Sequence, residues 1–196
     1  KKIITTSFDT EYFPKSRNIR QLVFYLKYFI LLREFLKESS NEIPGYLDEI
    51  IFHLGKGYNF VWGSVKQSLL FNGNHNSNLE DFDVYLDYQK YSFKSEKRDL
   101  GGYGILKNKN VILGMDIGTA PESKFSENYQ SGPLSFEAIY KGRKIICNSG
   151  YYQNTKKNLN LISRSTAAHS TLILNNNSIV SFKKNFRNKI LNKLNF

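Results

Sequence analysis

Gly132-Pro133-Leu134-Ser135-Phe136-Glu137 and Ser163-Arg164-Ser165-Thr166-Ala167-Ala168-His169-Ser170-Thr171 are the two stretches that decide the fold. The basic segment Arg143-Lys144-Ile145-Ile146-Cys147-Asn148-Ser149-Gly150 lies between them. Alternating apolar and polar residues are typical of strands that bury one face. The region from Met115 to Phe182 therefore predicts a half-buried sheet that presents polar groups.

Two β-hairpins are predicted in and beside this region. The first joins residues 103–107 to 111–117, and the second joins 134–140 to 143–148. Further strands are expected at 169–174, where His169 would share a face with Thr171 and Ile173, and at 179–182. Residues 120–131 and 151–161 are expected to be loops.

The first part of the chain has helical periodicity. A long helix is expected from about Asn18 to Lys37, with Ser16 or Asn18 as its cap. Pro44 fits the first turn of a second helix that ends at Gly55 or Gly57. The short loop between the two helices predicts an antiparallel helical hairpin.

The next part, up to residue 100, predicts smaller elements. Phe60-Val61-Trp62 and residues 68–71 are expected to be short strands, 79–88 an acidic helix and 90–99 a polar connection. Asp81, Asp83 and Asp87 are interpreted as a solvated helix face, with a calcium loop as the alternative. We thus divide the chain into residues 1–58, 59–100 and 101–196.

The composition is that of a folded chain, because 40% of its 196 residues are hydrophobic. A formal net charge of +11 favours a polyanionic partner such as an acidic polysaccharide, a nucleic acid or an anionic membrane surface. The alternative is a coding bias, because the chain is also rich in Asn, Ile and Tyr. No stretch is long and apolar enough to span a bilayer.

Two further features of the sequence lead to structural expectations. The single cysteine, Cys147, excludes an internal disulfide and is expected to be a small buried hydrophobe. The basic tail at residues 183–196 has roughly helical spacing at Phe186, Ile190, Leu191 and Leu194, and is interpreted as an amphipathic helix or a frayed end.

The order of the motifs resembles a known family. Leu134-Ser135-Phe136-Glu137, then Asn148-Ser149-Gly150, then residues 164–172 are similar to the C-terminal domain of the heparinase II/III superfamily. Upstream, Ser16-Arg17-Asn18 at the start of a helix and Leu70-Phe71-Asn72-Gly73 also resemble a bacterial branch of it. The resemblance covers roughly residues 16–182.

This resemblance implies an α+β, multidomain fold. The chain would hold the last helices of an α-helical toroid followed by an antiparallel β-sandwich, both incomplete, as a fragment of a longer protein. The implied activity is that of a polysaccharide lyase acting by β-elimination on a uronic-acid polymer, although the fragment alone is expected to be inactive. Relatives are often periplasmic, which predicts the periplasm or cell envelope, with the cytoplasm left open.

The resemblance also suggests site residues. His169 and Arg164 are the catalytic candidates, and the substrate-binding candidates are Arg17, Asn18, Asn128, Gln130 and Asn148. In some relatives the histidine that matches His169 binds zinc together with an aspartate and another histidine. Here Asn148 stands at the aspartate position, and Asn128 and Gln130 stand where lyases carry histidines, so no cofactor is expected.

Two alternative functions remain open. The first is a non-catalytic glycan-binding or envelope-assembly protein that kept the fold and lost the acid and base. The second is a basic nucleic-acid-binding module, which only the charge supports, so no nucleic-acid partner is expected. The oligomeric state is not predicted.

Overall fold

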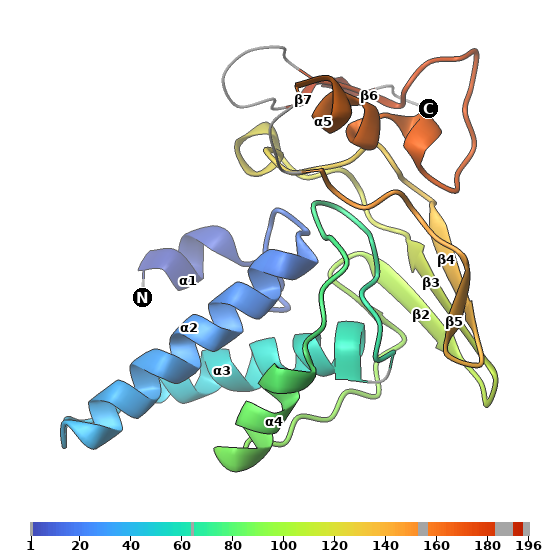
Figure 1. Cartoon of the computed structure of the whole chain (residues 1–196). Coiled ribbons are helices and arrows are strands. Elements are labelled where there is room, and N and C mark those ends of the chain that lie inside the picture. Colours follow the sequence, from blue (N-terminus) through green and yellow to red (C-terminus); the bar gives the residue numbers. More distant parts are fainter. Residues whose placement is uncertain (1, 64, 153–156, 183–189, 194–196) are drawn as a thin grey trace.

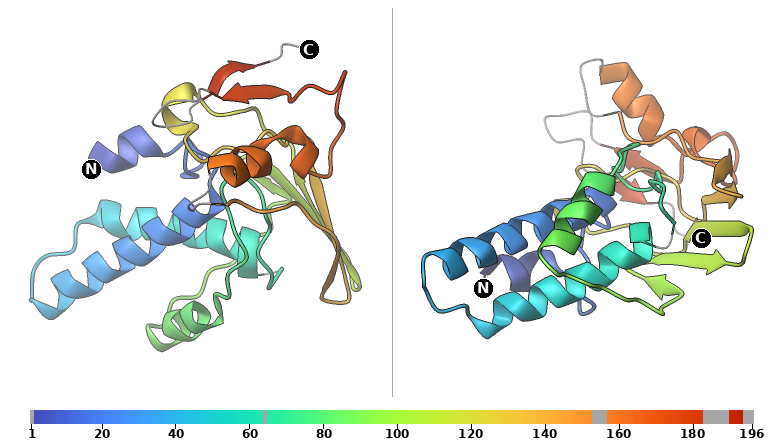
Figure 2. Two further views of the ribbon diagram at one scale, coloured as in Figure 1. Left: turned by 45° about the horizontal axis from the view of Figure 1, so that its top comes forward. Right: turned by 60° about the horizontal axis from the view of Figure 1, so that its bottom comes forward.

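The structure, a computed structural model, describes residues 2–63, 65–152, 157–182 and 190–193. A short helix, α1 (Lys2–Ser7), precedes a set of longer helices that pack against one side of an antiparallel sheet (Figures 1 and 2). Residues 157–182 and 190–193 lie beyond one end of that sheet (Figure 1). The predicted class, helices followed by an antiparallel β region, is confirmed.

Helices α2 (Ile19–Glu38) and α3 (Gly45–Tyr58) form the predicted pair. The Asn18 side chain caps α2 by accepting a hydrogen bond from the Gln21 backbone N–H at 3.1 Å. The predicted end of α3 was wrong, because Gly55 and Gly57 lie inside the helix. A Cβ added to Gly57 would lie 3.1 Å from Leu22 Cδ1, and one added to Gly55 would meet the ring of Phe93. These glycines therefore provide close packing.

The expected strands at 60–62 and 68–71 are also wrong. Phe60, Val61 and Trp62 belong to a buried π-helical turn, Asn59–Gly63, that continues α3. A short, wholly apolar run does not distinguish a strand from a buried helix. Residues 68–71 form no strand because their backbone groups bond to side chains, as in Asn74 Nδ2 donating to the Leu69 carbonyl at 2.7 Å.

The acidic helix is confirmed as α4 (Glu80–Tyr88). Its face is less solvated than expected, because Asp83 accepts hydrogen bonds from the Tyr58 hydroxyl at 2.6 Å and Trp62 Nε1 at 2.9 Å. The Lys66 ammonium lies 2.8 Å from the same carboxylate. Asp83 thus ties α4 to α3 and to the π-helical turn.

The sheet has five antiparallel strands in sequential order. They are β1 (Asp99–Leu100), β2 (Tyr103–Lys107), β3 (Val111–Asp116), β4 (Phe136–Tyr140) and β5 (Arg143–Ile146). Both predicted hairpins are confirmed by the pairing of β2 with β3 and of β4 with β5. The face that carries Tyr103, Ile105 and Ile139 joins the helices in one hydrophobic core.

The C-terminal segments differ most from the sequence-based expectations. Helix α5 (Lys157–Arg164) begins inside the loop expected at 151–161 and ends three residues beyond it, and residues 153–156 of that loop are outside the described part. The expected strand at 169–174 is wrong, because a 3₁₀ turn, Thr166–Ala168, leads into irregular backbone. Side-chain hydroxyl groups in this segment bond to backbone carbonyls of other segments, which favours irregular backbone over a strand. Thr171 Oγ1, for example, donates to the Pro133 carbonyl at 2.7 Å.

The final strands form a separate two-stranded sheet of β6 (Val180–Phe182) and β7 (Ile190–Lys193). The strand expected at 179–182 is thus confirmed, whereas a helix at residues 190 and 191 is wrong. The remainder of the expected tail helix, 183–189 and 194–196, lies outside the described residues.

Cys147 is exposed, which corrects its expected burial. It follows β5, which is an edge strand with a neighbour on one side only. Ile145, in the same strand, is 65% exposed for the same reason. Among the described residues, no helix has the length and hydropathy needed to cross a membrane.

Candidate functional site

The structure gathers most of the predicted site residues around one segment, residues 128–135. This segment lies between the start of α2, the end of β5 and the segment at 163–170. Asn128 and Gln130 lie in it, Arg164 and His169 contact it, and Asn18 and Asn148 are linked to it through Gly73 and through Ser170. Arg17 is the exception, because its side chain turns toward the sheet.

Arg17 connects α2 to the sheet. Its guanidinium donates to the carbonyls of Gly102 at 2.7 Å and Thr119 at 3.0 Å, and it forms an ion pair with Asp116. Burial acts to lower the pKa of Arg17, but Tyr103 and Asp116 outweigh it and raise that pKa. A buried arginine whose donors are taken by the protein stabilises the junction. This placement favours a structural role over direct contact with a ligand.

Asn18 and Asn128 meet at Gly73, which has a positive φ of 82°. A Cβ added to Gly73 would lie 2.4 Å from Asn18 Nδ2 and 2.9 Å from the Asn128 backbone oxygen. Only glycine combines that backbone conformation with so little space. The amide nitrogen Nδ2 of Asn18 is buried and has no hydrogen-bond partner.

Gln130 joins three segments through its buried amide. Its Oε1 accepts a hydrogen bond from the Gly73 N–H at 3.0 Å. Its Nε2 donates to the carbonyls of Gly150 at 3.0 Å and Ser163 at 2.7 Å. Both amide hydrogens and the amide oxygen are therefore used within the protein.

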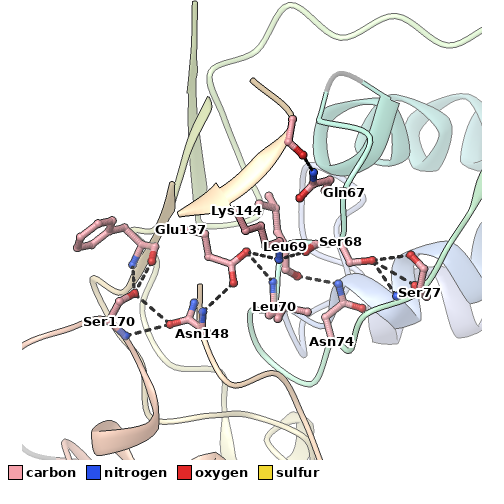
Figure 3. A network of polar contacts seen from close by, with 12 residues as sticks. Gln67, Ser68, Leu69, Leu70, Asn74, Ser77, Glu137, Lys144, Asn148 and Ser170 are labelled. Carbon is pink, nitrogen blue, oxygen red and sulfur yellow. Dashed lines mark hydrogen bonds and ion pairs between the residues drawn. The ribbon is translucent and has the colours of Figure 1, made fainter. Parts of the chain in front are cut away.

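Asn148 belongs to a network centred on Glu137, which is fully buried (Figure 3). Glu137 accepts hydrogen bonds from the backbone N–H groups of Asn148 at 2.8 Å and Leu70 at 3.1 Å, and pairs with Lys144 at 3.0 Å. The Asn148 side chain accepts from the Ser170 N–H at 3.1 Å, while its Nδ2 is buried without a partner.

Arg164 is completely buried beneath the loop that precedes residue 130. Its Nε donates to the Tyr129 carbonyl at 2.7 Å, and one terminal nitrogen donates to the Ser126 carbonyl at 3.0 Å. The Phe182 ring centroid lies 3.9 Å from the guanidinium carbon. Burial lowers the pKa of Arg164 to about 10, so the side chain remains charged at neutral pH. The second terminal nitrogen has no partner.

His169 packs its ring against Gly132. A Cβ added to Gly132 would lie 2.9 Å from His169 Cγ, so the glycine provides space for the imidazole. Burial lowers the pKa of His169 to about 4, although a hydrogen bond with the Ser163 backbone partly opposes this. The imidazole is therefore neutral at pH 7. Its Nε2 is buried without a partner, and in a neutral ring that nitrogen is an acceptor when the other carries the hydrogen.

The side chains around His169 do not fit a zinc ion. The positions that would supply the other ligands hold Asn148 in place of the aspartate and Asn128 and Gln130 in place of histidines, and amides are poor zinc ligands. Both Nε2–H groups of Gln130 already bond to backbone carbonyls. Within the described parts of the chain, no cluster of three or more His, Cys, Asp or Glu side chains could hold a metal ion.

Protein stability is expected to fall in mild acid because of His169. An unfolded histidine has a pKa near 6.5, so between pH 6.5 and about 4 the unfolded chain binds a proton that the folded protein does not. Stability is thus retained above pH 6.5 and lost as the pH falls, by about 2 kcal/mol between pH 7 and pH 5. Urea unfolding at both pH values should show this loss.

The matched variant for this measurement is His169→Asn, which removes the titrating ring. Carboxylates that titrate in the same range act equally in both proteins, so the difference between them reports His169. An identical loss of stability in the variant and the wild type would show that His169 is not held in the neutral form.

Three buried side chains near the site were not proposed as site residues from the sequence: Glu137, Asp116 and Tyr129. Glu137 lies in the quoted motif, and strand alternation with Ile139 would have placed its carboxylate on the buried face. The Tyr129 hydroxyl is buried without a hydrogen-bond partner. Burial is the largest cause that raises the pKa of Tyr129, and the nearby charge of Asp116 raises it further. No sequence pattern indicated this tyrosine.

Comparison with protein families finds a match over the C-terminal half of the chain. The sequence profile of the family described as heparinase II/III-like, C-terminal, matches residues 93–193. The matched range contains the sheet, the segment at 128–135 and His169. No protein with a curated description shows significant similarity to the chain.

Several solved structures share the fold. A heparinase III structure superposes with a TM-score of 0.74 at 12% identity, covering 91% of this chain and 32% of that chain. Heparan sulfate lyase HepC from Pedobacter heparinus gives a TM-score of 0.70 at 14% identity, covering 94% of this chain and 34% of that chain. The chain therefore spans about a third of the length of these structures, over both its helices and its sheet.

Proposed function

This chain belongs to the heparinase II/III-like C-terminal family, and we propose on that basis that the whole protein is a polysaccharide lyase. Its substrate would be an acidic, uronic-acid-containing polysaccharide, cleaved by β-elimination. The helices would be the end of an α-helical toroid, and the proposal requires no cofactor. It also places the protein in the periplasm or cell envelope, with the cytoplasm as the alternative that cell fractionation would test.

The observation that supports this proposal most directly is a concentration of unsatisfied polar atoms. Buried polar groups in proteins are almost always hydrogen-bonded. Around residues 128–135, however, the unpaired atoms include donors on Asn148 and Arg164 and the Nε2 of His169. Polar atoms that bind a ligand have no hydrogen-bond partner within the protein itself, so such a concentration is typical of a binding site.

The chemistry of β-elimination gives these atoms plausible roles. A base removes the proton at C5 of the uronate, and fixed donors stabilise the charge that develops on the neighbouring carboxylate. The bond from C4 to the leaving oxygen then breaks, and that oxygen takes a proton from a general acid. In our proposal the neutral His169 accepts the proton at Nε2. Asn148 Nδ2 and the free nitrogen of Arg164 donate to the carboxylate.

A lyase assay with full-length protein tests the proposal. Incubation with heparin, heparan sulfate and alginate should raise the ultraviolet absorbance of unsaturated uronate ends on at least one polymer. His169→Ala should lower the rate at least about 100-fold, the usual range for loss of a general base. His53→Ala, on α3, should retain the wild-type rate within about twofold. No absorbance rise on any polymer would count against the lyase.

A second function, glycan binding without cleavage, is supported by another observation. The donors of Arg17 and Gln130, two of the predicted substrate-binding residues, are taken by the protein itself. Such a protein would bind glycans with no turnover. Binding on a glycan array that persists in His169→Ala, combined with an inactive wild type, would favour this function over the lyase.

A further inference from the structure

A second concave surface lies at the other end of the sheet from the candidate site. It is a groove of about 560 Å³. One wall is the connection at residues 95–98, and the other includes residues 105–107 of β2, which extend past the two-residue strand β1. Volumes of ~300–1,000 Å³ are typical of small-ligand pockets. In Figure 1 the turn between β2 and β3 lies at the lower right, whereas α5 and β6 lie at the top.

Hydrogen bonds hold both walls of this groove in place. The Ser95 N–H donates to Asn59 Oδ1 at 3.1 Å, which fixes the connection to the end of α3. The Ile105 N–H donates to the Arg98 carbonyl at 2.8 Å, which fixes it to β2. At the turn, Asn108 Oδ1 accepts from the N–H groups of Asn110 at 2.9 Å and Val111 at 2.8 Å. The groove is therefore formed before any ligand binds.

The charges along the groove have one sign. Lys97, Arg98 and Lys107 line it, and no Asp or Glu is among the described residues that do. Lys97 pairs with Glu11 outside the groove. Arg98 is exposed and makes no ion pair with any residue that the structure describes. A concave surface lined by like charges and partly apolar side chains concentrates the electric field, so it attracts anions.

We propose that this groove binds a carboxylate or sulfate group of an acidic saccharide, with Arg98 as the central contact. The guanidinium fork matches both oxyanions, and charge-assisted hydrogen bonds of this kind are the strong ones. Leu106 and Leu113, which pair on one face of the sheet and also line the groove, would pack against the sugar ring, and the Ser95 hydroxyl would bond to a sugar hydroxyl. The choice of ligand class rests on the proposed function, whereas the site is separate from it.

Such a site would hold the polymer at a second point. Two points of attachment on one chain raise the apparent affinity because the second contact becomes intramolecular. Long polymers should therefore bind more tightly than short ones, and loss of the groove should remove most of that difference.

Isothermal titration of the full-length protein tests the inference. The probes are a heparan sulfate oligosaccharide and an alginate oligosaccharide of equal length, which separate sulfate from carboxylate recognition. Arg98→Ala should weaken binding of at least one of them by tenfold or more, as expected for a lost charge-assisted bond. Lys109→Ala removes the same charge from the adjacent turn, outside the groove, and should change affinity by less than about twofold.

Two outcomes would overturn the inference. Equal losses in Arg98→Ala and Lys109→Ala would show that only net charge matters. Single-stranded DNA of equal charge that binds as tightly, and loses affinity equally in Arg98→Ala, would show that the ligand class is wrong. The lyase assay separates this inference from the proposed function: an inactive wild type that still loses oligosaccharide binding in Arg98→Ala refutes the lyase and keeps the groove.

Discussion

Replacement of Glu137 by alanine is expected to lower the free energy of unfolding by about 3–5 kcal/mol. Glu137 is fully buried and accepts hydrogen bonds from Asn148 and Leu70 while it pairs with Lys144 (Figure 3). The alanine variant leaves two backbone donors and a largely buried ammonium without partners, in addition to a cavity. The loss should be measured by urea unfolding at pH 7.

Glu96→Ala is the matched control, because Glu96 is exposed on the connection that precedes β1. Its expected effect is below about 0.5 kcal/mol. The double variant Glu137→Gln/Lys144→Met should be less destabilised than the sum of its two single variants, because removing both charges leaves neither one buried alone. A Glu137→Ala protein as stable as the Glu96→Ala protein would contradict a stabilising role for the network.

Replacement of Arg164 by alanine is expected to cost a similar amount, about 3–5 kcal/mol. The Tyr129 carbonyl would lose its arginine donor, the Ser126 carbonyl would keep the Tyr129 N–H but lose the guanidinium, and the Phe182 ring would lose its packing partner. Arg164→Lys keeps the charge but cannot donate to both carbonyls in the same geometry, so about half of the loss should remain. Thermal and urea unfolding of the full-length protein would measure both effects.

Arg143→Ala is the control for Arg164, because it removes the same charge from the exposed edge strand β5. It should change stability by less than about 0.5 kcal/mol. The Arg164 variants also separate two roles of that side chain. If Arg164 only bound a substrate carboxylate, Arg164→Ala would weaken substrate binding and leave unfolding unchanged, which would contradict the bracing role.

The periodicity of apolar residues was sufficient to predict those helices and strands that pack against or pair with the next element in the sequence. The apolar stripes of α2 and α3 and the alternation in both hairpins depend on residues three or four apart, or two apart, along the chain. Asn18 was one of the two caps predicted, with Ser16, because capping also acts over three residues. The family resemblance rested on motifs of this local kind, and the profile match to residues 93–193 confirms it.

Secondary-structure prediction failed where the hydrogen-bond partners of the backbone are residues far away in the sequence. Residues 68–71 and 169–174 have strand-like composition, but their backbone groups bond to side chains such as Asn74, Lys144 and Asn148 instead of a neighbouring strand. For the candidate site, the sequence could name His169, Asn148 and Gln130. It could not show which of their polar atoms are used, because the hydrogen-bond partners of the Gln130 and Asn148 side chains lie 20 or more positions away along the chain.

The sequence by itself determined the family, the order of helices and hairpins, and the positive charge, because each depends only on composition or on the spacing of residues that are close in the sequence. Only the tertiary structure decided that Arg17 and Arg164 serve as buried braces, that Glu137 is the centre of a buried network, and that Cys147 is exposed. Burial is a property of the packed chain, and it depends on which surfaces meet. The same packing leaves His169 neutral, with an unpaired nitrogen.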